Sequence, residues 1–140
     1  MFTNTTSGKK FVAKYKTGSP YTDYAPIIRY SEVLLNLAEA LARTNTGVNA
    51  KALALLNAVR QRSDVATILA PADQAALINA ILLERRIEFL GEGLRNFDLM
   101  RLLQTIPAKG SITAKAASEQ GYIWPISADE LSLNKLMTDN

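Results

Sequence analysis

The sequence contains neither cysteine nor histidine. Without cysteine, the 140-residue chain has no disulfide bonds, no thiolate metal ligands and no cysteine nucleophile. Without histidine, it lacks the commonest general base and zinc ligand, so catalytic triads and histidine-based zinc sites are excluded. Any catalysis would depend on carboxylates, lysines and hydroxyls, and we predict no cofactor and no metal site.

Long apolar runs and a strong charge of one sign are also missing. No stretch approaches the roughly 18 apolar residues that a membrane-spanning helix needs, and we recognise no secretory leader at Met1. The net charge is only +3, so we expect no nucleic-acid partner. With 48% apolar and 21% charged residues, the composition is that of a globular protein, and the length predicts a single domain over residues 1–140.

Residues 26–62 are predicted to form an antiparallel pair of helices. Asn49 is a suitable N-cap for the second helix. Tetratricopeptide units have a similar length, roughly 34 residues, and about three stacked units are needed to bury a continuous core. We therefore expect an apolar face that is covered either by the tail or by a larger superhelix. The apolar stripe of the first helix has spacings of three and four and consists of Ile27, Tyr30, Leu34, Leu37 and Leu41.

The flanking regions complete a mainly α fold of tetratricopeptide-like hairpins. Residues 1–25 are predicted to be an irregular lead-in with one short strand, where Phe11, Ala13 and Tyr15 alternate with their neighbours. Residues 73–104 are predicted to hold two helices separated by a glycine bend, with Asp73 at the start of the first. Residues 105–140 are predicted to be an irregular tail, in which Trp124 is interpreted as a core anchor.

The densest cluster of charged residues lies around the glycine bend. Glu84, Glu88 and Glu92 are spaced by four, which places three carboxylates on one helical face, where they repel one another unless cations neutralise them. One interpretation makes Glu88 and Glu92 the acid and nucleophile of a glycosidase. The interpretation that we favour is an arginine–carboxylate lock between two helices, formed by Glu84, Arg85, Glu88, Glu92, Arg95, Asp98 and Arg101. In this lock, Arg95 and Arg101 turn back from beyond the glycines to face the acidic ladder.

Three aromatic residues are candidates for ligand contact. Tyr21 and Tyr24 lie in a polar segment just before a helix, and an exposed tyrosine ring can stack on a sugar while its hydroxyl forms hydrogen bonds. Trp124 is the third candidate, as an alternative to its interpretation as a core anchor.

Four motifs follow one another along the chain. They are Ile28–Leu35 continuing to Ala38-Glu39-Ala40, Leu56–Arg60, Glu84–Glu88 with Glu92–Arg101, and Pro125-Ile126 with Glu130, Asn134 and Asn140. In this order, they resemble the motifs of the C-terminal region of the SusD/RagB family. Ser31 stands where the family usually has alanine, and Ser127 and Lys135 stand where it usually has prolines.

The resemblance implies a non-catalytic protein that binds a glycan or other nutrient and delivers it to a TonB-dependent, SusC-like transporter. It also implies a surface lipoprotein of the outer membrane, attached only by a lipid anchor upstream of these residues, with this soluble segment as a helical scaffold. The family's nutrient pocket is formed largely by preceding segments, so no binding residue is carried over. An alternative is a helical-repeat module that binds another protein without direct glycan contact, and a more remote one is the carboxylate glycosidase.

Overall fold

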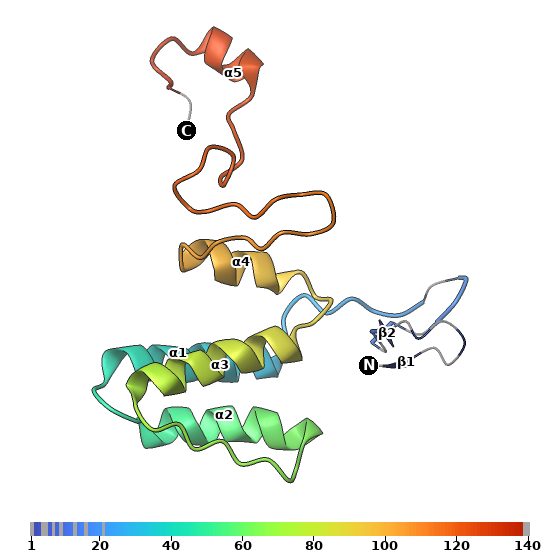
Figure 1. Cartoon of the computed structure of the whole chain (residues 1–140), viewed down its shortest axis with the longest axis vertical. Helices are drawn as coiled ribbons and strands as arrows, with labels where there is room; N and C mark the ends of the chain where they lie inside the picture. The colour runs from blue at the N-terminus through green and yellow to red at the C-terminus, as the bar shows by residue number, and fades with distance from the viewer. Residues whose placement is uncertain are drawn as a thin grey trace. The chain divides into compact units, whose positions relative to one another are not determined.

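The computed structural model describes residues 2–3, 6, 8, 10–12, 14–15, 17–20 and 22–138. It divides into two compact units, Met1–Leu94 and Arg95–Asn140, which are described separately below. Five helices and two very short strands are present among the described residues, so the prediction of a mainly α fold is confirmed (Figure 1). None of these helices has the length and hydrophobicity that a membrane span requires.

The lead-in contains one small antiparallel strand pair. Strand β1, Phe2–Thr3, pairs with strand β2, Lys10–Phe11, so that Phe2 lies opposite Phe11. The predicted strand was expected to continue through Tyr15, but it ends at Phe11. The reason is that the chain leaves the ladder to contact the helical part of the unit, where Lys14 and Tyr15 bind backbone carbonyls beyond α3. Ala13, part of the predicted alternation, lies outside the described residues.

Helices α1 (Tyr30–Thr44) and α2 (Ala50–Ser63) form the predicted hairpin and pack directly against each other (Figure 1). Asn49 caps α2, because its side-chain oxygen accepts a hydrogen bond of 2.9 Å from the Ala52 N–H. Helix α3 (Gln74–Glu88) packs mainly against α1, and Asp73 caps it through a 2.7 Å hydrogen bond from the Ala76 N–H. The core of the three helices is centred on the fully buried side chains of Leu35, Leu56, Leu77 and Ile81.

The face that α1 buries differs from the predicted one. Leu35, Ala38 and Ala42 are completely buried, whereas Ile27, Tyr30 and Leu37 of the predicted stripe are exposed and Leu34 and Leu41 are partly buried. The physical reason is that the small side chains of Ala38 and Ala42 allow neighbouring helices to approach α1 closely. The predicted stripe of larger apolar side chains is therefore not the face that α1 buries.

The connection between α2 and α3 is held by one asparagine. The Asn57 side chain accepts a 2.8 Å hydrogen bond from the Leu69 N–H and donates one of 3.0 Å to the Leu69 carbonyl. A single amide therefore satisfies both backbone groups of a residue in an irregular segment, which otherwise would lack partners. This gives a structural reason for asparagine in the Leu56–Arg60 motif.

The second unit contains α4 (Leu94–Arg101), whose first residue is the last of the first unit, and α5 (Ala128–Leu133). Between them the chain is irregular, with isolated bridges that pair Ile106 with Lys115 and Lys109 with Ile112. Tyr122 is the buried aromatic of this segment, and its hydroxyl donates to the Leu99 and Gln104 carbonyls. The interpretation of Trp124 as a core anchor is wrong, because its side chain is 85% exposed.

Candidate functional site

The acidic ladder lies where α3 ends and the chain turns through Gly91 and Gly93. Glu84 and Glu88 occupy the last two turns of the helix, and Glu92 follows in the turn. All three carboxylate side chains are buried, with 5%, 7% and 4% exposure respectively. A buried carboxylate is stable in its ionised form only when cations and hydrogen-bond donors replace the water it has lost. The donors around these three groups therefore define the site.

Arg29, which immediately precedes α1, joins two members of the ladder. Its Nε and Nη2 atoms bind the two carboxylate oxygens of Glu92 at 3.1 and 2.9 Å. Its Nη1 atom binds Glu88 Oε1 at 2.6 Å, and Nη2 also donates to the Glu88 carbonyl at 3.1 Å. The planar guanidinium is suited to such two-point contacts, which fix orientation as well as charge. Arg29 thus fixes the start of α1 against the end of α3.

Two further cations approach the same carboxylates. Lys14, from the lead-in, forms an ion pair with Glu92 and donates to the Glu88 carbonyl at 2.7 Å. Arg62, from the last turn of α2, forms an ion pair with Glu88. Because the carbonyls at the end of a helix carry partial negative charge, the cations at the Glu88 carbonyl also stabilise the end of α3. Three separate segments are therefore connected at this turn.

Glu84 has a different partner. Its Oε2 atom lies 2.5 Å from Nη2 of Arg60, which belongs to α2. Arg85, next to it, is buried and donates to the side-chain oxygen of Asn36 on α1. The guanidinium groups of Arg85 and Arg29 both lie near the ring of Phe89, at 5.4 and 5.3 Å from its centre, which is the range of cation–π contacts.

The two buried glutamates respond to their surroundings in opposite directions. Burial raises the pKa of Glu84 above its usual range, and the nearby charge of Arg60 offsets this only in part. Burial also acts to raise the pKa of Glu88, but the hydrogen bonds from Arg29 and Arg62 outweigh it, and the pKa of Glu88 is lowered. For Arg29, burial acts to lower the pKa, yet its hydrogen bonds to Glu92 and Glu88 raise it. Glu88 and Arg29 therefore stabilise each other's charged forms.

This geometry suits structural ion pairs better than acid–base catalysis. A glycosidase acid needs a raised pKa and access to the substrate. Glu88 has a lowered pKa and is buried beneath Arg29 and Arg62. Glu84 has a raised pKa but is buried and paired with Arg60. Among the described residues, no three acidic side chains gather in a way that suits a metal ion.

The predicted lock residues fall into two groups. Glu84, Arg85, Glu88 and Glu92 lie together in the first unit. In the second unit, Arg101 binds Asp98 within α4, with its Nε and Nη2 atoms at 3.0 and 2.8 Å from Asp98 Oδ1, and Arg95 is exposed. The pairing of Arg95 and Arg101 with the ladder therefore stays a prediction.

Four cations that contact the carboxylates were not predicted from the sequence. They are Lys14, Arg29, Arg60 and Arg62. Each precedes the ladder by more than twenty residues, so helical spacing gives no sign of these contacts. Arg29 and Arg60 do lie within motifs that resemble those of a known family, and that was the one available signal.

The candidate aromatic residues do not form a common site among the described residues. Tyr24 is 95% exposed, as expected for a loop tyrosine, and Trp124 is also exposed. Tyr21 lies outside the described residues. Tyr24 and Trp124 belong to different units, so their role in ligand contact stays a prediction.

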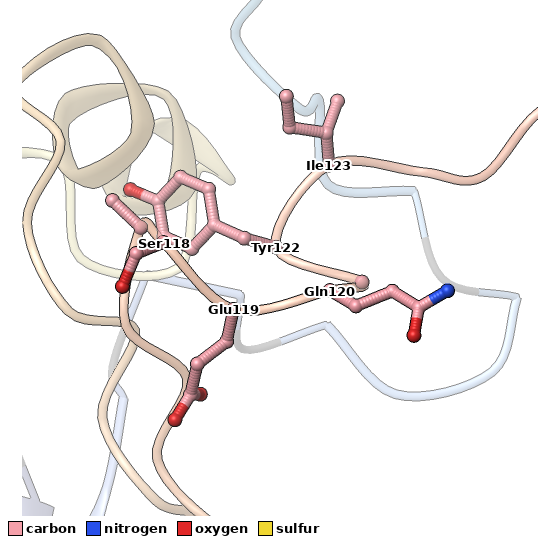
Figure 2. A pocket seen from close by; sticks show the side chains of 7 residues that line it. Ser118, Glu119, Gln120, Tyr122 and Ile123 are labelled. Carbon is pink, nitrogen blue, oxygen red and sulfur yellow. The ribbon is translucent and has the colours of Figure 1, made fainter. Parts of the chain in front are cut away.

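The second unit has a shallow hollow of about 350 Å³ lined by residues 117–123 (Figure 2). Figure 2 shows that the side chains of Glu119 and Gln120 diverge from each other rather than converging on a common point. Glu119 already accepts a 3.0 Å hydrogen bond from the Ala116 N–H, and the hydroxyl of Tyr122 is occupied by two carbonyls. The hollow thus lacks the convergent polar groups of a specific ligand site.

Comparison with known proteins identifies the group to which these features belong. A family model described as the SusD family matches residues 2–140. SusD-like protein P38 of Formosa agariphila is 31% identical over 132 residues, which are 87% of this chain and 25% of that protein. A SusD superfamily protein from Bacteroides vulgatus has a TM-score of 0.68 at 28% identity, covering 85% of this chain and 29% of that structure. Another, from Bacteroides fragilis, has a TM-score of 0.60 at 38% identity, covering 81% and 28%. The chain thus spans about a quarter of the length of these relatives.

Proposed function

The chain belongs to the SusD family, and from this membership we propose that it is the C-terminal part of a longer protein that binds a glycan or other nutrient. The observation that carries the proposal is the family match over residues 2–140, which includes all four motifs. The coverage of only 25% of the P38 protein supports the idea of a longer whole.

In this proposal, the whole protein is a lipoprotein on the outer-membrane surface. It captures its nutrient by shape, aromatic stacking and hydrogen bonds, and delivers it to a TonB-dependent, SusC-like transporter. A lipid anchor upstream of these residues attaches it to the membrane. The nutrient is bound mainly by segments that precede this one.

The role of the present segment is that of a helical scaffold without catalytic residues. The buried carboxylates support this role, because Glu88 and Glu92 are each bound by two cations from different segments. Such a network holds the end of α3 against the start of α1 and the end of α2. In this proposal the lock has a structural role, and Arg95, Asp98 and Arg101 are its members beyond Gly91 and Gly93.

A second candidate function is protein–protein interaction through the helical hairpin. It is favoured by the exposed apolar side chains of α1, such as Tyr30 and Leu37, which are typical of an interaction surface. Both functions are compatible within one protein, because one part can bind the nutrient while another contacts a partner.

Native gel electrophoresis in the presence of a panel of polysaccharides tests the proposed function. The protein should be produced together with the sequence encoded before residue 1, and the 140-residue chain should be run alongside. We expect retardation of the longer protein by one class of glycan, without release of reducing sugar. Hydrolysis of that glycan, abolished by Glu88→Gln without loss of stability, would contradict the proposal and favour the glycosidase. Co-purification with a transporter, without any glycan retardation, would favour the interaction module.

A further inference from the structure

The turn that follows α3 presents several oxygen atoms to the lead-in. The Glu92 N–H donates a 3.0 Å hydrogen bond to the Phe89 carbonyl and so closes the turn. Between these two residues, Gly91 has a φ of +80°, a backbone conformation that L side chains rarely adopt. The carbonyls of Glu88 and Leu90 and the carboxylate of Glu92 all contact a single atom of the lead-in.

That atom is Nζ of Lys14. It donates to the Glu88 carbonyl at 2.7 Å, forms an ion pair with the Glu92 carboxylate and lies 3.5 Å from the Leu90 carbonyl oxygen. An ammonium group has three N–H donors and no acceptor, so the three oxygens match its donors in number. Carbonyls at the end of a helix also carry partial negative charge, which favours a cation there. These three oxygens are here called the ammonium site.

Arg29 contacts the same carboxylate in a different way. Its planar guanidinium binds both carboxylate oxygens of Glu92 and also reaches Glu88, as suits a flat fork of donors. The ammonium of Lys14 is a compact charge whose donors point in three directions, and such a group suits oxygens that surround one point. The two cations therefore use different geometries at one carboxylate.

Two neighbours of Lys14 in the sequence cover the same turn. A Cβ atom added at Gly91 would lie 3.6 Å from a ring carbon of Tyr15 and 3.8 Å from a methyl group of Val12, so both side chains lie over the backbone of Gly91. The Tyr15 hydroxyl lies 3.4 Å from the Gly91 carbonyl oxygen. The lead-in thus packs directly on the turn, and this contact places the ammonium of Lys14 at its site.

We propose that the turn after α3 is a binding site for a primary ammonium group, which Lys14 of the same chain occupies, and that recognition of this group fastens the lead-in to the helices. Two of the three oxygens are neutral carbonyls, which require N–H donors and not only a positive charge. A quaternary ammonium of the same charge has no N–H, and its methyl groups keep the nitrogen away from the oxygens. The site therefore distinguishes a primary ammonium from a cation in general.

The absence of cysteine from the sequence allows the ammonium to be replaced chemically at one position. In Lys14→Cys, alkylation of the unique thiol with bromoethylamine gives a side chain as long as lysine that ends in a primary ammonium. Alkylation with bromoethyl-trimethylammonium gives the same chain with a quaternary ammonium. Each reaction is run on the denatured protein, which is then refolded. Lys51→Cys, treated in the same way, is the control, because Lys51 is an exposed lysine of α2 in the same unit.

Thermal melting compares the two forms of each variant. We expect the primary ammonium form of Lys14→Cys to melt close to the native protein. The quaternary form should melt lower by an amount on the order of 5 °C, because the two carbonyls lose their donors. The two forms of Lys51→Cys should melt at the same temperature. Equal melting temperatures for the two forms of Lys14→Cys would show that only the charge matters and would overturn the proposal.

An NMR measurement tests whether this recognition fastens the lead-in. A nuclear Overhauser effect between a ring proton of Tyr15 and an α proton of Gly91 reports the contact, because the ring carbon lies 3.6 Å from the Cβ position of Gly91. We expect this effect in the native protein and in the primary ammonium form of Lys14→Cys, and its loss in the quaternary form. Its persistence in the quaternary form would overturn the fastening role. Neither measurement involves a glycan, so both outcomes are independent of the proposed function.

Discussion

Replacement of Arg29 by glutamine is the most informative test of the ion-pair network. The side chain of Arg29 is 23% exposed, while the side chains of its partners Glu88 and Glu92 are 7% and 4% exposed. Removal of one partner from a buried ion pair typically costs about 3–5 kcal/mol, whereas an exposed pair contributes about 0–1 kcal/mol. Lys14 and Arg62 still neutralise the two carboxylates in the variant, so we expect the lower end of the first range, about 3 kcal/mol.

Urea denaturation followed by circular dichroism measures this loss. A decrease of about 3 kcal/mol in the free energy of unfolding corresponds to a fall in melting temperature on the order of 10 °C for a domain of this size. Arg86→Gln serves as the control, because Arg86 is an exposed arginine on α3, the helix that carries Glu88, and its replacement should leave the melting temperature unchanged. If Arg29→Gln destabilises the protein no more than Arg86→Gln does, the ion pairs of Arg29 make no net contribution to stability, and the structural role assigned to Arg29 is refuted.

The pH dependence of the same difference gives a second check. The pKa of Glu88 is lowered from its ordinary value of 4.5, so the unfolded chain takes up a proton more readily than the folded one as the pH falls. The stabilisation is therefore fully present above about pH 5 and is lost as the pH falls through the folded-state pKa. The difference in stability between the native protein and Arg29→Gln should shrink on acidification. A difference that stays constant down to about pH 3 would contradict the assignment of this charge pair.

Three further substitutions test individual features of the structure. At neutral pH, Glu88→Gln should lower the melting temperature more than Glu84→Gln does. The reason is that the surroundings of Glu88 favour its charged form, whereas burial disfavours the charged form of Glu84. The opposite order would contradict the two pKa directions. Gly91→Ala should cost about 1–2 kcal/mol of unfolding free energy in a urea titration, because Gly91 has a φ of +80°. Gly18→Ala serves as the control and should be nearly neutral, because Gly18 does not have a positive φ. Tyr122→Phe should cost about 1 kcal/mol, because the Gln104 carbonyl loses the hydroxyl that donates to it, whereas the Leu99 carbonyl keeps the Gln104 N–H. A melting curve identical to that of the native protein would show that these bonds contribute nothing.

Local sequence signals predicted the helices well. Asn49 and Asp73 mark the starts of α2 and α3 because their side chains bond to backbone N–H groups only three residues away. Because each cap joins groups only three residues apart, the start of the helix can be predicted from the local sequence alone.

Contacts between distant segments were not predictable in the same way. Arg29 and Glu88 are 59 residues apart, and no periodicity relates them. Likewise, Tyr122 and Trp124 are both large aromatics in one short segment, and only the path of the chain decides that the hydroxyl of Tyr122 reaches two carbonyls while the ring of Trp124 is exposed. The buried face of α1 was not predicted for the same reason. Which of its residues are buried depends on where the neighbouring helices pack, and not on side-chain size alone.

The anchoring of Lys14, Tyr15 and Arg29 at one turn has a consequence for how this protein tolerates change. Both ends of the segment between Tyr15 and Arg29 are fastened to residues 88–92 by separate bonds. Insertions within the segment would therefore leave the helices undisturbed and would add only the entropy of closing a longer loop, about 0.6 kcal/mol for each doubling of its length. We therefore expect insertions in this segment to preserve the fold as long as the three anchoring side chains are kept.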